Sequence, residues 1–94
     1  MRNFVFGYAR VSTEQQNLDR QIDMLEKYGV DHIYNEKMTG TKRNRPELEK
    51  LLERLTEGDT VVVESLSRLG RSTKDLIWLM ETFNGRGVNL VSLK

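Results

Sequence analysis

The apolar residues of this chain alternate between short continuous runs and helical stripes, and this alternation constrains the fold most strongly. Residues 4–11 (FVFGYARV) and 60–63 (TVVV) are rich in aromatic and β-branched side chains, which is typical of strands. A short, continuous apolar run such as 60–63 is expected for a strand buried on both faces of a parallel sheet. Residues 32–35 and 88–93 are the other two predicted strands.

Three amphipathic helices are predicted between these strands. Their start signals are a capping box from Thr13 to Gln16, Pro46 in a first helical turn, and Ser72 three residues before Asp75. Apolar stripes at spacings of three and four follow each start. The predicted ends are Gly29, Gly58, and the pair Gly85 and Gly87. Strand–helix alternation of this kind predicts an α/β fold, with a mainly parallel central sheet of about four strands and helices on both faces.

Composition narrows the chemistry that is available to the chain. Its 94 residues allow one domain. The lack of cysteine excludes a disulfide scaffold, a thiolate nucleophile and a Cys-ligated metal, and the single histidine disfavours a His-based metal site. No apolar run approaches the roughly 18 residues of a membrane span, and no signal-peptide pattern is present, so we expect a soluble, cytoplasmic protein without a membrane partner. The net charge of +1 conceals two basic stretches without acids, at 37–45 and 65–74.

Three polar segments follow predicted strands, where α/β proteins gather their functional groups. In the first segment, Tyr8, Arg10 and Ser12 are at alternate positions and therefore point to the same face of the strand. A predicted helix begins directly after them, and a helix N-terminus favours a bound anion. The others are the basic stretch 37–45 and residues 67–72. Guanidinium forks match phosphate oxygens, and a hydroxyl among them can act as a nucleophile. The arginines that could surround one phosphate without a metal are Arg10, Arg45, Arg68 and Arg71.

Each of these signals also has an ordinary structural interpretation. Ser12 is placed to cap a helix, which is the usual role of a serine before a helix. The capping box explains Gln16, a core position would explain Tyr8, and a solvated face or a turn would explain the basic segments. These segments contain no histidine or aspartate, so no general base is assigned. Their joint placement at one sheet edge is what favours a functional site.

At these residues the chain resembles the serine recombinases, the resolvase/invertase family. The motifs are residues 8–13 (YARVST) with glutamines at 15, 16 and 21, residues 44–48 (NRPEL), and residues 67–71 (SRLGR). Their order and spacing extend the resemblance over essentially the whole chain. Two positions depart from the family pattern: Ser67 stands where an acid usually precedes R-L-G-R, and Glu36 stands where many members have aspartate.

The resemblance implies a resolvase-like catalytic domain in which Ser12 attacks a DNA phosphodiester, forming a 5′-phosphoserine link and releasing a 3′-hydroxyl. Strand exchange and resealing would need no metal, nucleotide or other cofactor. Carried over residue by residue, Arg10, Arg68 and Arg71 would bind the scissile phosphate. Arg45 would assist from a loop, and Tyr8, Gln16 and Gln21 would support the site. The implied partners are a DNA recombination site and further copies of the chain, as a homodimer that assembles into a tetramer.

No helix follows the last predicted strand, so residues 1–94 are expected to be a catalytic-core fragment without the C-terminal dimerisation helix and the DNA-binding domain. Such a fragment would be inactive in isolation. The alternative is a catalytically inactive regulatory or oligomerisation module of the same fold. A receiver or flavodoxin-like module lacks support, because no acidic magnesium cluster or glycine-rich cradle is present. Trp78 lies opposite the stripe formed by Leu76, Leu79, Met80 and Phe83, and we interpret it as a contact to a partner or to the missing segment.

Overall fold

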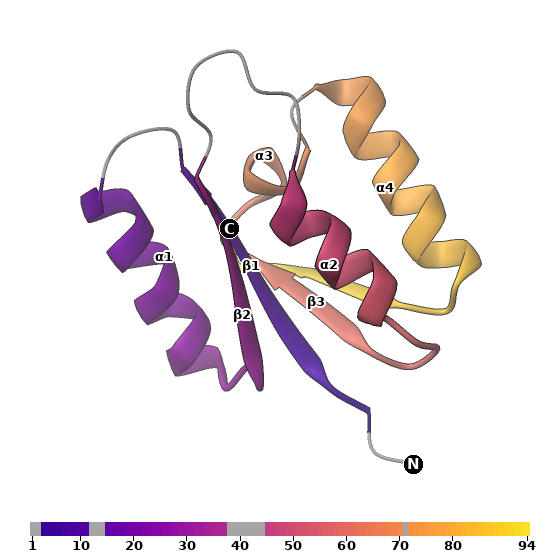
Figure 1. Ribbon diagram of the computed structural model, residues 1–94, viewed down its shortest axis with the longest axis horizontal. Coiled ribbons are helices and arrows are strands. Elements are labelled where there is room, and N and C mark those ends of the chain that lie inside the picture. Colours follow the sequence, from indigo (N-terminus) through magenta and orange to yellow (C-terminus); the bar gives the residue numbers. More distant parts are fainter. Residues whose placement is uncertain (1–2, 12–14, 38–44, 71) are drawn as a thin grey trace.

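Four parallel strands form one sheet (Figure 1). The computed structural model describes residues 3–11, 15–37, 45–70 and 72–94, with the backbone only at 15–17. The strands are β1 (Val5–Val11), β2 (His32–Lys37), β3 (Thr60–Val63) and β4 (Asn89–Ser92). Their order is β2-β1-β3-β4 and every pairing is parallel, so their carboxyl ends lie at one edge of the sheet.

The helices lie on both faces of this sheet, as the alternating pattern predicts. They are α1 (Gln15–Tyr28), α2 (Pro46–Arg54), α3 (Leu66–Leu69) and α4 (Thr73–Gly85). Figure 1 shows α1 on one face and α2 and α4 on the other, with α3 near the carboxyl ends of the strands. The short helix α3 was not predicted, because four residues are too few to display a helical period.

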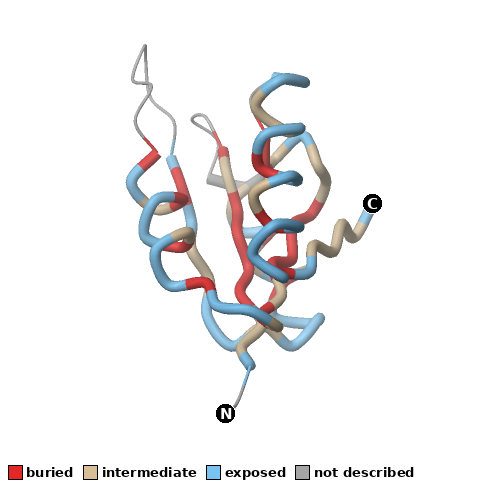
Figure 2. The backbone as a smooth tube through the Cα atoms, turned by 90° about the vertical axis from the view of Figure 1, so that its right-hand side faces the viewer, coloured by how far each residue is buried: buried red, intermediate tan, exposed pale blue. Residues whose placement is uncertain are grey.

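Two apolar clusters fill the space between sheet and helices, and buried residues follow the central strands (Figure 2). The larger cluster includes Phe6 and Tyr8 of β1 and lies under α2, α3 and α4. The smaller cluster includes Ala9 of β1 and Leu25 of α1. Alternate residues of β1 therefore face opposite clusters, and the face of Tyr8 is the one that leads to Arg10.

Helix ends test the predicted capping signals. Asp75 donates its backbone N–H to Ser72 Oγ at 3.1 Å, which confirms the predicted start of α4. Gly29 follows α1 with a φ of 100°, as a terminating glycine does. The predicted end of α2 at Gly58 was wrong, because the helix ends at Arg54. The cause is Asp59, whose carboxylate accepts hydrogen bonds from the N–H and Oγ1 of Thr56 and turns the chain earlier.

The predicted phase of α4 is confirmed at Trp78, which is 55% exposed and lies off the buried face. Met80 was wrongly assigned to the buried stripe, since it is 43% exposed. Leu79 and Phe83 are the buried residues of this helix, so the covered face is narrower than the stripe suggested. Within the described ranges, no helix combines the length and apolarity needed to cross a membrane.

Asp59 also makes stability depend on acid pH. Its carboxylate accepts hydrogen bonds from Phe4 and Thr56. Burial acts to raise the pKa of Asp59, but these hydrogen bonds outweigh burial, and the pKa lies below its ordinary value of 3.8. The ionised carboxylate therefore contributes its full stabilisation at pH values above the ordinary pKa. This stabilisation is lost as the pH falls through the lower pKa of the folded state.

We predict that Asp59→Asn lowers the free energy of unfolding by about 1–3 kcal/mol at pH 7, because Thr56 and Phe4 lose a charged acceptor. The difference from the wild type should shrink when urea unfolding is repeated near pH 3. Asp23→Asn is the matched control, since Asp23 forms only an exposed ion pair with Lys27 and should change stability by under about 0.5 kcal/mol. A difference for Asp59→Asn that stays the same at both pH values would contradict this account.

Candidate active site

Arginine and glutamate residues stand at the carboxyl ends of β1, β2 and β3, which lie at one edge of the sheet (Figure 1). Arg10 lies one residue before the end of β1, Glu36 one residue before the end of β2, and Glu64 directly after β3. The backbone of α3 and the first turn of α4 join the same edge, where they contact Arg10 and Arg45. The parallel topology thus brings together residues that are far apart in the sequence.

Arg10 uses its guanidinium to hold the end of α3. Its Nε donates to the carbonyl of Arg68 at 3.1 Å, and its Nη2 donates to the carbonyls of Ser67 at 2.6 Å and Gly70 at 3.0 Å. These carbonyls lie at a helix end, where backbone acceptors need partners from outside the helix. The resemblance implied that Arg10 would bind phosphate. In this structure its side chain fixes the backbone segment that carries Arg68.

Gln21 holds the end of β1 from the other side. It is fully buried on α1, where its Oε1 accepts from the N–H of Arg10 at 3.2 Å and its Nε2 donates to the carbonyl of Arg10 at 3.3 Å. A side-chain amide here satisfies both backbone groups of one strand residue, as a neighbouring strand would. Gln21 thus fixes the backbone of Arg10 from α1.

Arg45 lies in the interior, in the position directly before α2, and is 5% exposed. Its Nη1 is 2.9 Å from Asp75 Oδ2, and its Nη2 donates to the Tyr8 hydroxyl at 3.0 Å and to the carbonyl of Leu69. The resemblance placed Arg45 on a loop beside the phosphate. The structure instead directs its guanidinium inward, because a carboxylate, a phenol and a helix-end carbonyl offer it partners there.

Tyr8 is fully buried beneath Arg45. Burial raises the pKa of its phenol above the ordinary value of 10.0, although the hydrogen bond from Arg45 acts in the opposite direction. The phenol therefore keeps its proton at neutral pH and donates it towards Glu36 Oε1, 3.5 Å away. A buried phenol that keeps its proton is poorly suited to act as a nucleophile.

Glu36 is a buried carboxylate that joins β2 to α2. It lies beside Arg10 in the register of β1 and β2. Its oxygens accept the N–H groups of Leu48 at 3.1 Å and Glu47 at 3.3 Å, both in the first turn of α2. A carboxylate at a helix N-terminus satisfies unpaired N–H groups and interacts favourably with the helix dipole. At this position, where many family members have aspartate, both carboxylate oxygens of Glu36 accept hydrogen bonds from the start of α2.

Glu64 is a charged residue at this edge of the sheet that was not among the predicted site residues. It is 3% exposed and forms ion pairs with Arg20 and Arg68. The available signal was its place directly after the buried run 60–63, at the carboxyl end of a predicted strand. The acid-free stretch began one residue later, at Ser65, so this carboxylate was left out of the site.

Several predicted site residues fall outside this description. Ser12 and Arg71 lie outside the described residues, as do Thr13 of the predicted capping box and most of the basic stretch 37–45. Gln16 lies in the first turn of α1, and only its backbone is described. Among the residues that the structure describes, no three His, Cys, Asp or Glu side chains converge as metal ligands do.

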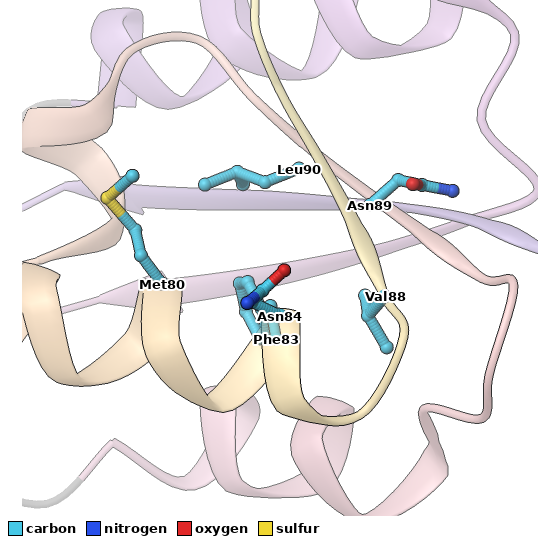
Figure 3. A pocket seen from close by; sticks show the side chains of 6 residues that line it. All are labelled: Met80, Phe83, Asn84, Val88, Asn89 and Leu90. Atoms are coloured by element: carbon cyan, nitrogen blue, oxygen red, sulfur yellow. The ribbon is translucent and has the colours of Figure 1, made fainter.

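Two hollows open on the surface near α4. One, of about 300 Å³, lies at the junction of α3 and α4 beside the carbonyls that Arg10 holds; its lining residues are Leu66, Ser67, Gly70, Ser72, Thr73 and Leu76. The other, of about 240 Å³, lies between the last turns of α4 and the start of β4; Figure 3 shows its lining residues Met80, Phe83, Asn84, Val88, Asn89 and Leu90. The second hollow is lined by no ionisable side chain and is remote from the carboxyl edge, so only the first belongs to the candidate site.

The fold and the site define a parallel α/β domain that gathers arginines and carboxylates at the carboxyl edge of its sheet. Residues 5–94 match the family model described as the N-terminal domain of resolvase. The chain therefore belongs to the resolvase family and is a serine recombinase catalytic domain.

Relatives of known class agree with this assignment. The chain is 52% identical over 90 residues to the Tn917 resolvase of Enterococcus faecalis, covering 96% of this chain and 49% of that protein. It is 47% identical over 89 residues to the serine recombinase Gin of Escherichia phage Mu, covering 95% and 46%. The chain thus spans about half the length of the curated relatives it matches.

Solved structures match the fold closely. The catalytic domain of ISC1926 TnpA, an IS607-like serine recombinase, superposes with a TM-score of 0.80 at 29% identity, covering 96% of this chain and 67% of that one. A serine recombinase from Sulfolobus solfataricus gives a TM-score of 0.80 at 26% identity, covering 99% and 69%. The predicted resolvase-like fold is confirmed by these matches.

Proposed function

We propose that this chain is the part of a site-specific DNA recombinase that cuts and rejoins DNA strands. Ser12 Oγ forms a bond to the scissile phosphorus as the bond to the 3′-oxygen breaks. The products are a 5′-phosphoserine link and a 3′-hydroxyl, which takes up the proton. The reverse attack by a 3′-hydroxyl reseals the strand, and no nucleotide is consumed because the phosphodiester energy is kept in the covalent link.

One observation carries this proposal. The side chain of Arg10, which lies two residues before Ser12 in the sequence, hydrogen-bonds to the backbone of Arg68 near the end of β1. Two arginines are thereby fixed beside the start of the segment that carries the nucleophile. Positive charge preorganised in this way stabilises a pentacoordinate phosphoryl group. We assign Arg68 and Arg71 to the phosphate, and Arg10, Arg45, Tyr8, Gln16 and Gln21 to the support of the site.

The proposed partners follow from the same assignment. A recombination site on DNA is the substrate, and a homodimer that pairs into a tetramer supplies the four serines needed to cut four strands. No metal or cofactor has a part in this scheme. The reaction takes place where bacterial DNA lies, in the cytoplasm.

The test is a covalent-adduct assay with a full-length recombinase that carries residues 1–94 as its catalytic domain. The substrate is nicked DNA whose sequence is taken from the region beside the gene of the recombinase. The nick prevents resealing, so the covalent protein–DNA adduct accumulates. Peptide mass analysis should locate a 5′-phosphate link on Ser12. DNA binding without any adduct would instead favour the regulatory module of the same fold.

A further inference from the structure

Glu64 places a buried negative charge between two arginines at the carboxyl end of β3. The Arg20 fork takes both carboxylate oxygens: Nη1 pairs with Oε2, and Nη2 lies 3.4 Å from Oε1. On the other side, Arg68 Nε lies 3.5 Å from Oε1. Glu64 itself is 3% exposed, whereas the side chains of Arg20 and Arg68 are 42% and 30% exposed.

The way in which Arg68 meets Glu64 leaves most of its guanidinium open. Its ion pair is made through Nε, and among the described residues no hydrogen bond or ion pair involves Nη1 or Nη2. The two Nη groups form the end of the guanidinium fork, which binds two oxygens of a phosphate at once. Arg10 and Arg45 differ, because their Nη groups donate to backbone carbonyls of the protein itself.

Ser67, which stands where related sequences usually carry an acid, does not supply a charge here. Its Oγ pairs with Ser65 Oγ at 2.9 Å, on the exposed side of α3. The carboxylate that pairs with Arg68 belongs to Glu64, which lies four residues earlier in the sequence and directly follows the buried strand β3. A strand end is a rigid support, and rigid supports hold functional groups within the small tolerance that binding requires.

We propose that Glu64 is a positioning residue: it holds Arg68 through Nε so that the two Nη groups face a phosphate, while Arg20 neutralises the carboxylate. Without Arg20, the carboxylate would repel the phosphate that Arg68 is to bind. The three side chains together carry one net positive charge. This inference rests on the proposed function only for the identification of that phosphate as part of DNA.

The test follows the Arg68 side-chain NMR signals of the ¹⁵N-labelled chain during titration with inorganic phosphate. In the wild type, phosphate should shift the Arg68 signals. Glu64→Gln should weaken this response at least about tenfold, as the loss of a partner that orients a binding group does. Glu64→Asp, which keeps the charge but shortens its reach, should give an intermediate affinity. Glu53→Gln, the loss of an exposed carboxylate on α2, should match the wild type.

The outcomes separate this inference from the proposed function. Equal phosphate affinity in the wild type and Glu64→Gln would overturn it, as would a wild type whose Arg68 signals do not respond. If Glu64→Gln does not give a folded backbone spectrum, Glu64→Asp decides, and wild-type affinity in that variant overturns the inference. A phosphate response that depends on Glu64, in a protein that forms no DNA adduct, would retain the positioning role and reject the recombinase reaction.

Discussion

Ser12→Ala is expected to abolish covalent protein–DNA adducts in a full-length recombinase that carries residues 1–94 as its catalytic domain. Removing a serine nucleophile from a hydrolase costs about 10⁶-fold in turnover, so we expect a fall of at least about 10⁴-fold here. DNA binding should remain, because phosphate contacts of the arginines supply sequence-independent affinity. Adduct formation is measured by denaturing gels with nicked DNA, and binding by gel shift at fixed salt.

The competing interpretation, in which Ser12 only caps a helix, makes the opposite prediction. Loss of a capping serine costs about 1 kcal/mol of stability and would leave adduct formation intact. Ser12→Asn separates the two roles, because asparagine caps helices as well as serine does but cannot form the phosphoester. Adducts that persist in Ser12→Asn would reject Ser12 as the nucleophile.

Arg45→Ala is expected to act mainly on folding. The variant removes a buried guanidinium that pairs with the partly exposed carboxylate of Asp75 and donates to Tyr8 and Leu69. Leaving the buried Tyr8 hydroxyl and Leu69 carbonyl without their donor costs about 1–3 kcal/mol each, which in a domain of this size lowers the melting temperature by about 10 °C or more. Thermal unfolding followed by circular dichroism measures the effect directly.

The control for this prediction is Lys27→Ala, which removes one partner of the exposed ion pair with Asp23 and should cost under about 0.5 kcal/mol. A stable Arg45→Ala variant that loses only DNA cleavage would contradict the placement of Arg45 in the interior. It would favour the role beside the phosphate that the resemblance implied. Melting temperature and cleavage rate thus distinguish a folding residue from a phosphate ligand at the same position.

Local signals predicted the elements of this fold well. The apolar run at residues 60–63 and the Ser72 cap at α4 each depend on neighbours within a few positions, and such patterns are visible in one sequence. The partners of the site residues were not visible. Glu64 meets Arg20 across 44 positions and Arg45 meets Asp75 across 30, and only the strand order brings these pairs together.

The same reason explains why Arg45 was predicted at a loop surface. A basic stretch without acids is usually solvated, and no local pattern in the sequence indicates which distant carboxylate would pair with Arg45. The acid that receives Arg45 belongs to the first turn of α4, where Asp75 had already been explained as part of a cap signal. One residue here serves two structural purposes, and sequence patterns reveal only the local one.

The hydrogen bonds of Glu36 also determine where α2 begins. They tie the end of β2 to the first turn of α2, which directly follows Arg45. From that position Arg45 reaches Tyr8 and Asp75. A shift of this helix start would move the guanidinium away from both partners, so a carboxylate on β2 helps to fix the geometry of an arginine on another element.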